Sequence, residues 1–234
     1  EKTDDPSDHY GCIEYKMIVD ERMVTYIHSL ETPENPLLEE IEKKALDTYV
    51  PIIRKETKSF LKTLITMNRP MNILEVGTAV GFSALVMSEY APVGCKITTI
   101  ENYDKRIPIA RENFKRAGKE SDITLLEGDA LEVMKGLASP YDFVFMDAAK
   151  GQYIHYLPEV TRLLAEGGVL VSDNVLQDGD VIESRYAVER RNRTIHSRMR
   201  EYLFELKHSD IYETSILPLG DGIALSVKRR TSEK

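Results

Sequence analysis

The sequence has little cysteine and no long apolar run. Its 234 residues include two cysteines, Cys12 and Cys95, which lie far apart in the chain. Two separated cysteines exclude a disulfide framework and a cysteine-based zinc site, and they favour a reducing compartment, the cytoplasm. No apolar stretch approaches the roughly 20 residues of a membrane-spanning helix, so no membrane association is expected. The acidic first residues also differ from a signal peptide.

The sequence also has no excess of basic residues. The chain has 31 lysines and arginines against 39 acidic residues, and its formal net charge is −8. This balance argues against a protein that coats nucleic acid without specificity, although it leaves room for a local basic patch. Hydrophobic residues make up 42% and charged residues 30%. Such a chain is long enough, and apolar enough, to form one globular α/β domain.

The order of apolar and polar segments predicts a polar, disordered lead over residues 1–16 and a single domain over 17–234. Strands and helices alternate from residue 72 onward, which predicts a parallel sheet with helices on both faces. Strands are expected at 72–76, 96–101, 123–127, 143–147 and 168–173, and helices at 20–30, 37–49, 52–67, 82–90, 104–116, 130–137, 153–164 and 183–206. Two further strands, at 212–217 and 223–227, predict a closing hairpin at the sheet edge.

The glycine turn after the first of these strands separates two classes of cofactor. A dinucleotide fold uses G-x-G-x-x-G, whose middle glycine lets the backbone approach a pyrophosphate. Here the glycines are Gly77 and Gly81, Ala79 occupies the middle position, and Glu75 stands just before the turn. A carboxylate repels a pyrophosphate but suits a cationic ligand. S-adenosylmethionine (SAM) carries a sulfonium and an ammonium group without a phosphate, so the turn predicts a SAM-dependent methyltransferase rather than a dehydrogenase.

Acidic residues follow the expected parallel strands at their carboxyl ends, where doubly wound sheets bind ligands. The five acids are Glu75, Glu101, Asp129, Asp147 and Asp173. Glu101 can accept both hydroxyls of a ribose, or it can be a charge favoured by the next helix dipole. Asp129 would border the adenine, and it can also cap the following helix, which is compatible with binding.

Two carboxylates and one amide form a second group at neighbouring strand ends. Asp147, Asp173 and Asn174 offer hard oxygen ligands, which suit Mg²⁺ better than zinc. Asp173 and Asn174 could instead only cap a turn. Lys150, three residues beyond Asp147, could take the proton of an acceptor hydroxyl, or it could be a solvated loop lysine.

Residues 190–200 concentrate arginine in an otherwise acidic chain. The arginines are Arg190, Arg191, Arg193, Arg198 and Arg200. Spacings of seven residues place pairs of them on one exposed side of an expected helix, whose apolar stripe begins at Ile195. The concentration predicts a partner that carries phosphates, and a solvated charged face is the alternative.

Three motifs resemble those of the metal-dependent class I O-methyltransferases, the family of the catechol and caffeoyl-coenzyme A enzymes. They are residues 75–83 (EVGTAVGFS), 147–153 (DAAKGQY) and 173–176 (DNVL), and the resemblance covers about residues 20–228. It implies a Rossmann-like sheet of seven strands, one of them reversed, and extra N-terminal helices that cover the site and join a homodimer. It also implies SAM ligands at Glu75, Gly77, Thr78, Ser83, Glu101, Asp129, Ala130 and Asp147, divalent-metal ligands at Asp147, Asp173 and Asn174, and a general base at Lys150.

The arginine run, with residues 151–153 and 219–222, looks closer to a bacterial branch, the tRNA 5-hydroxyuridine methyltransferases. These enzymes form 5-methoxyuridine at the wobble position, so the resemblance predicts the tRNA anticodon loop as partner. Ala149 stands where many coenzyme A-ester enzymes carry an acid, which weakens a plant-type assignment. The expected reaction is a direct in-line methyl transfer from SAM to a hydroxyl oxygen, with Mg²⁺ as Lewis acid and template.

Two alternatives to the tRNA enzyme stay open at this point. One is the same chemistry on small catechol-like or caffeoyl-CoA-like acceptors with vicinal oxygen atoms. The other is a non-catalytic module that binds SAM or RNA. The complete metal set together with Lys150 argues against the module, because pure binding needs neither.

Overall fold

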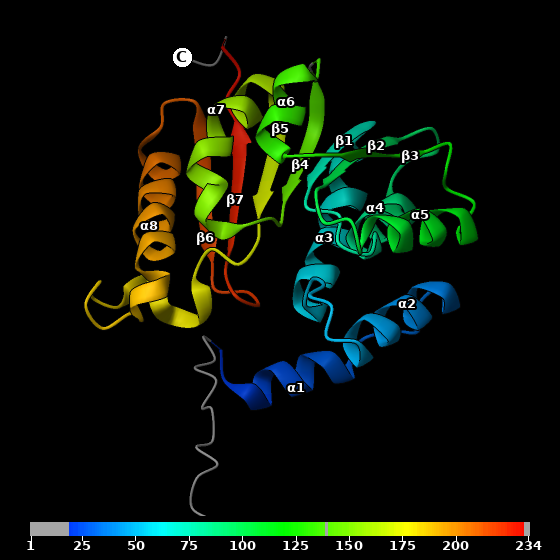
Figure 1. The fold of residues 1–234 in the computed structure, drawn as a ribbon, viewed down its shortest axis with the longest axis horizontal. Coiled ribbons are helices and arrows are strands. Elements are labelled where there is room, and N and C mark those ends of the chain that lie inside the picture. Colours follow the sequence, from blue (N-terminus) through cyan, green and yellow to red (C-terminus); the bar gives the residue numbers. More distant parts are fainter. Residues whose placement is uncertain (1–18, 139, 232–234) are drawn as a thin grey trace, which may run out of the picture.

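The computed structural model describes residues 19–138 and 140–231, and the expected lead over residues 1–16 lies outside this part. Seven strands form one sheet in the order β3-β2-β1-β4-β5-β7-β6 (Figure 1). Their bounds are β1 Asn72–Val76, β2 Lys96–Glu101, β3 Ile123–Glu127, β4 Tyr141–Met146, β5 Leu164–Ser172, β6 Tyr212–Leu217 and β7 Ile223–Lys228. β1 to β5 pair in parallel, whereas β7 is antiparallel to both β5 and β6. This topology confirms the predicted fold class.

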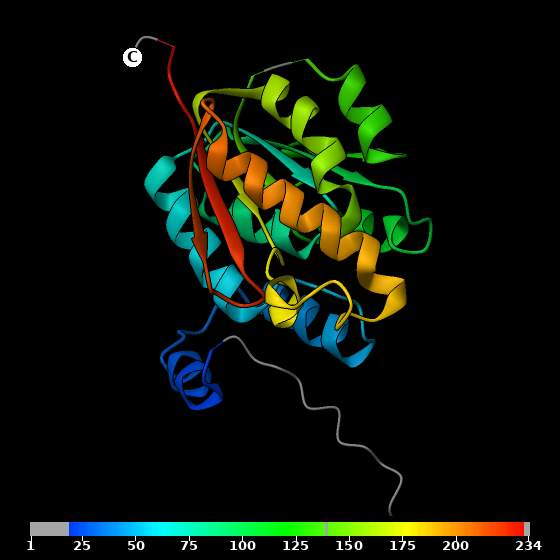
Figure 2. The same cartoon turned by 90° about the vertical axis from the view of Figure 1, so that its left-hand side faces the viewer.

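Helices pack on both faces of the sheet (Figures 1 and 2). One face is covered by α3 (Lys55–Asn68), α4 (Phe82–Tyr90) and α5 (Ile107–Arg116), and the other by α6 (Ala130–Gly136), α7 (Tyr153–Leu163) and α8 (Arg193–His208). Two more helices, α1 (Glu21–Ser29) and α2 (Pro36–Asp47), lie below the sheet in Figure 1. The parallel strands point towards this end, so their carboxyl ends face the N-terminal helices.

Strand β4 shows how the core is divided between the two faces. Phe143 and Phe145 belong to one apolar cluster, while Val144 and Met146 belong to the other, and all four are fully buried. Successive side chains of a strand point to opposite faces, and a parallel sheet is covered on both. Residues 143–146 of the strand are therefore an uninterrupted apolar run.

The chain between β5 and α8 differs from the prediction. A helix was expected over residues 183–206, but α8 begins only at Arg193, and two short 3₁₀ turns, η2 (Gln177–Ile182) and η3 (Arg190–Asn192), precede it. Positive φ angles at Gln177 and Asp178 interrupt regular structure there. The apolar stripe that a helix buries against the core starts at Ile195, so the preceding residues lack a continuous face to bury.

The start of β5 also differs from the prediction. The strand begins at Leu164, four residues before the expected start, because it follows α7 without an intervening loop. Its first residues pass through Gly167, which has a positive φ, and a bulge shifts the register with β4 at this point. Among residues 19–138 and 140–231, no helix is long and apolar enough to cross a membrane.

Candidate functional site

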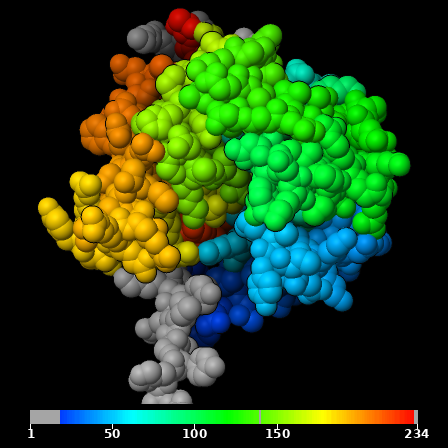
Figure 3. Space-filling model, in the orientation of Figure 1, coloured from blue at the N-terminus to red at the C-terminus, as the bar shows by residue number. Residues whose placement is uncertain are grey.

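Two adjoining cavities lie at the carboxyl ends of β1, β2 and β4. The first, of about 400 Å³, is lined by Gly77, Ile100, Glu101, Asn102, Tyr103, Arg106, Gly128, Ala130, Ala148, Ala149 and Tyr156. The second, of about 240 Å³, is lined by Pro51, Ile52, Ile53, Gly77, Thr78, Ala79, Phe82, Ser83, Glu101, Arg106, Asp147, Ala148, Lys150 and Asn174. Four residues line both, so the cavities form one cleft. In Figure 3 the surface is hollowed between the yellow and orange atoms after β5 and the green and cyan atoms around β1 to β3.

Gly77 allows the turns after β1 and β4 to meet in this cleft. Its φ is +104°, and a Cβ atom at this position would lie 2.1 Å from the carbonyl oxygen of Asp147. No larger residue fits without moving the backbone that carries Asp147. The predicted SAM ligand Gly77 is thus brought next to the predicted metal ligand Asp147.

Glu101 lies at the junction of the two cavities and is held by backbone donors. Its Oε2 accepts from the amide of Ala79 at 2.7 Å, and its Oε1 accepts from the amides of Asn102 and Tyr103 at 3.0 Å each. Each carboxylate oxygen has two lone pairs, so Oε1 is fully used and Oε2 keeps one site for a further donor. The structure brings Glu101 to the cleft in a fixed orientation, and its contact with a ribose stays a prediction.

The other predicted cofactor ligands divide between the cavity walls and helix capping. Ala130 lines the first cavity, and Thr78 and Ser83 line the second. Asp129 accepts from the amides of Leu131 and Glu132 at 3.0 and 3.2 Å, so it is the N-cap of α6. This is the role that the sequence left open as an alternative, and it does not prevent Asp129 from bordering a ligand.

Glu75 is fully buried behind the cleft. The hydroxyl of Ser83 donates to it at 2.5 Å, and the hydroxyl of Thr99, a residue that the sequence did not single out, donates to its other oxygen. Burial raises the pKa of Glu75 to about 8, although both hydroxyl groups oppose the shift. Glu75 therefore ties β1 to β2 and α4 from inside, and a direct contact between its carboxylate and SAM stays a prediction.

The predicted metal ligands occupy the ends of β4 and β5. Asp147 and Asn174 line the second cavity, and Asp173 is buried beside them. Asp173 Oδ1 accepts from the amide of Asn174 at 2.8 Å, whereas the buried Oδ2 has no hydrogen-bond partner among the described residues. Burial, followed by the charge of Asp147, raises the pKa of Asp173 to about 8, and burial raises that of Asp147 to about 6.

These features fit a divalent cation. Within the part of the chain that the structure describes, no three His, Cys, Asp or Glu side chains converge as a metal site, so the candidate set is two carboxylates and one amide. An unpartnered buried oxygen beside a second carboxylate is unfavourable, and a hard cation would relieve both the missing bond and the repulsion. Asp147, Asp173 and Asn174 are the residues that would hold it.

Lys150 has a buried partner that the sequence left without a role. Its Nζ donates to Oδ2 of Asp221 at 3.0 Å, and the Asp221 side chain is only 2% exposed. The amide of Asp178 also donates to Asp221. Asp221 lies between two glycines in the turn that joins β6 to β7. An acidic residue in a glycine turn after a strand is the sequence pattern by which it could have been predicted.

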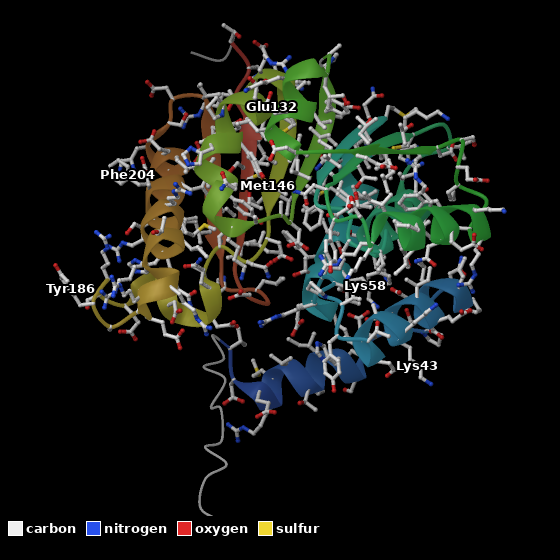
Figure 4. All side chains as sticks on the ribbon, in the orientation of Figure 1. Lys43, Lys58, Glu132, Met146, Tyr186 and Phe204 are labelled. Carbon is white, nitrogen blue, oxygen red and sulfur yellow. The ribbon has the colours of Figure 1, made fainter. Side chains whose placement is uncertain are left out.

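The predicted arginine face is rearranged. Arg190 and Arg191 lie in η3, which runs into α8 at Arg193, so the seven-residue spacing of Arg191 and Arg198 spans a 3₁₀ turn and an α-helix and not one continuous helix. The other three arginines donate to backbone carbonyls at 3.0–3.3 Å. Arg193 donates to Tyr186 and Val188, Arg198 to Gly151, and Arg200 to Val181. These hydrogen bonds hold α8 to the segment after β5 and to the turn that carries Lys150. Tyr186 of that segment projects into solvent (Figure 4).

Comparison with known proteins agrees with this geometry. The sequence profile of a family described as O-methyltransferase matches residues 27–229. A catechol O-methyltransferase of Mycobacterium tuberculosis is 32% identical over 176 residues, which cover 73% of this chain and 77% of that protein. One of Niastella koreensis is 34% identical over 128 residues, 53% of this chain and 58% of its own length. An O-methyltransferase of Bacillus cereus in complex with SAH shares the fold, with a TM-score of 0.78 at 24% identity, over 89% of this chain and 97% of that one.

Proposed function

Because the chain belongs to the O-methyltransferase family, we propose that it methylates a hydroxyl group of a small aromatic acceptor with neighbouring oxygen atoms, with the help of a divalent cation. The chain is a SAM-dependent O-methyltransferase of the catechol and caffeoyl-CoA type. The size of the acceptor and the need for the cation are the proposed part.

The observation that carries the proposal is the set of groups gathered in the second cavity. Asp147, Asn174 and Lys150 line the same cavity of about 240 Å³ as the predicted SAM ligands Thr78 and Ser83, so the metal set, the proposed base and the methyl donor share one space. Ile52 and Ile53 also line an apolar cavity of about 690 Å³ formed by α1, α2, α3 and residues 218–220. Cavities of this size and character take small ligands. They support an acceptor that places one end at the acids and an apolar remainder between the N-terminal helices.

Each group has a task in this reaction. Asp147, Asp173 and Asn174 would hold the cation, which when bound supplies Lewis-acid polarisation of acceptor oxygens. Lys150, oriented by Asp221, would take the proton of the acceptor hydroxyl as the neutral amine, because its charged form has no lone pair to accept it. The Gly77 turn and Glu101 hold SAM, and the fixed positions of donor and acceptor supply much of the acceleration.

A tRNA acceptor is the second candidate, and the arginine-rich segment favours it. Arg190 and Arg191 are exposed, Arg191 in an ion pair with Glu189, and Arg198 reaches the turn that carries Lys150 next to the cleft. The names of the curated relatives fit small acceptors better. The hydrogen bonds of Arg193 and Arg200 to backbone carbonyls give these residues a reason to be present without RNA.

Methyl transfer from labelled SAM separates the two candidates. Under the small-acceptor proposal a catechol is methylated, chelator abolishes the activity, and Mg²⁺ restores it. Exchanging Arg190 and Arg191 for Gln leaves this activity unchanged, because neither side chain fastens the backbone. If instead only tRNA with 5-hydroxyuridine reacts, the affinity should fall with salt by a log–log slope of roughly 0.7–0.9 per phosphate, less in the double variant. That result replaces the proposal, and full activity in excess chelator removes the cation from it.

The exposed face of α1 supports the homodimer that the family resemblance implies. Met23, Tyr26 and Leu30 are between 58% and 62% exposed, although all three are large and apolar. Contiguous apolar surface of this kind marks a contact with another chain. Light scattering should give twice the monomer mass, and Tyr26→Lys with Leu30→Lys should reduce it to the monomer.

A further inference from the structure

Arg106 is a charged residue of the cleft to which neither the sequence motifs nor the reaction above gives a role. It lines both cavities and stands at the N-cap of α5. A tight turn puts it there, because its amide donates to the carbonyl of Tyr103 at 2.8 Å. Its guanidinium also lies over the ring of Tyr103, 5.1 Å from the centroid, which restrains the side chain.

Arg106 has no ion-pair partner among the described residues, unlike Lys150, the other cation of the cleft. The described residues that line the two cavities include four charged ones, Glu101, Asp147, Lys150 and Arg106. Lys150 is paired with Asp221, and Glu101 accepts three backbone amides. Arg106 makes no ion pair with any residue of the described ranges. It is a half-buried cation on the cleft wall that is free to pair with an anionic group of a ligand.

SAM brings two cationic groups and one carboxylate to this cleft. The acids Glu101 and Asp147 suit the cationic groups but repel the carboxylate of the methionine moiety. Ser83, a hydroxyl on the wall of the second cavity, is hydrogen-bonded to Glu75 and carries no charge that offsets this repulsion. A guanidinium is the group that pairs best with a carboxylate, through two parallel hydrogen bonds.

We propose that Arg106 binds the methionine carboxylate of SAM and so selects cofactors that carry an intact amino acid. The proposal depends on SAM as the methyl donor and is independent of the acceptor. Arg106 is a binding residue and takes no part in the proton transfer at Lys150.

Calorimetry with three ligands tests the assignment without any acceptor. For Arg106→Gln we expect the Kd of SAM and of SAH to rise roughly 10- to 100-fold, the range for a hydrogen bond to a charged group. The Kd of decarboxylated SAM, which lacks only the carboxylate, should not change. Arg106→Lys keeps the charge but loses the paired geometry, so it should recover part of the affinity. Arg111→Gln is the matched control, since Arg111 lies on the same helix and pairs with Glu127 at the surface.

The outcomes distinguish three situations. If Arg106→Gln weakens SAM and decarboxylated SAM equally, Arg106 shapes the site without reading the carboxylate, and the proposal fails. If the variant binds SAM like the wild type but raises the KM of the acceptor, its partner is an anionic acceptor group, and the proposal fails again. Binding of decarboxylated SAM by the variant shows that it is folded. Absence of SAM binding by the wild type would instead remove the methyl donor from the proposed function.

Discussion

Two sets of buried charges in this protein are built in opposite ways. The paired cluster joins α3 to α2 and the preceding loop: Lys58 lies 3.2 and 2.9 Å from Glu34 and Glu42, and Lys62 lies 2.6 Å from Glu34. The cleft acids are Glu75, Asp147 and Asp173, gathered at the strand ends, where Lys150 is the cation that acts on the two aspartates. The charges of the paired cluster are neutralised within the protein, whereas the cleft acids need a cation supplied by a ligand.

The pKa values follow this difference. Burial lowers the pKa of Lys58, but its hydrogen bond to Glu42 and the charges of both glutamates outweigh burial, so the pKa is raised. Burial raises the pKa of Glu34, but Lys62 and Lys58 outweigh it, so the pKa is lowered. The cleft acids all have raised pKa values, because burial there is not offset. Their ionised forms weaken the fold, as expected of groups kept for a ligand.

Breaking the paired cluster should give the largest effect on stability. Lys58→Met leaves the buried Glu42 without its partner and Glu34 with Lys62 alone, and removing one member of such a pair costs about 3–5 kcal/mol of the free energy of unfolding. Denaturant unfolding measures this loss. Lys43→Met is the matched control, because Lys43 lies exposed on α2 and makes no ion pair with any described residue (Figure 4). A loss below 1 kcal/mol for Lys58→Met would mean that the cluster is not a stabilising element.

Changing a cleft acid should affect the reaction and leave the fold intact. Asp173→Asn keeps the shape of the side chain but removes one charged ligand of the proposed cation. Turnover should fall about 10²- to 10³-fold, the range for one preorganised electrostatic group. The Kd of SAM should stay within about threefold, since Asp173 lines neither cavity. Steady-state rates at saturating Mg²⁺ and calorimetry separate these outcomes, and wild-type turnover in the variant would exclude Asp173 as a ligand.

The pH dependence of stability should distinguish Glu75 from the paired cluster. Its pKa is about 8 in the folded protein and near 4.5 in an unfolded chain, so the folded state binds the extra proton between these values. The free energy of unfolding therefore falls as pH rises from about 4.5 to 8. Glu75→Gln removes this contribution, so its stability relative to wild type should rise over that window by up to about 5 kcal/mol, since each pKa unit corresponds to about 1.4 kcal/mol. Parallel pH profiles for variant and wild type would contradict the buried, uncompensated carboxyl.

Local pattern predicted much of the fold. β1, β2, β3 and α4 have the expected bounds, because each is an apolar segment between clear turn signals. The segment after β5 was missed, because its short turns depend on hydrogen bonds from arginines of α8 to backbone carbonyls. No sequence pattern reveals such an acceptor.

The site was predictable as far as its residues follow parallel strands. The acids at the ends of β1, β2, β4 and β5 were found by that rule. Asp221 was not assigned, because it reaches Lys150 only when the β6–β7 hairpin folds back, 71 residues away in the chain. Arg106 was missed for a related reason. Its position at the start of α5 brings it to the cavities, but in the sequence it cannot be told apart from a solvated arginine at the start of a helix.

Glu101 shares features of both sets of charges. It lies in the cleft like the acids, yet it is held by three donors like the paired cluster. Glu101→Ala should weaken SAM binding by about 1–3 kcal/mol, the loss of hydrogen bonds to a charged group. Stability should change less, because the amides of Asn102 and Tyr103 are at the surface and water can replace the carboxylate. Glu127→Ala is the matched control, since Glu127 is the partner of Glu101 in the β2–β3 register and lines neither cavity. If calorimetry shows unchanged SAM affinity while the free energy of unfolding falls by 1–3 kcal/mol, Glu101 is a structural residue of the turn, and the ribose contact has to be assigned to another group.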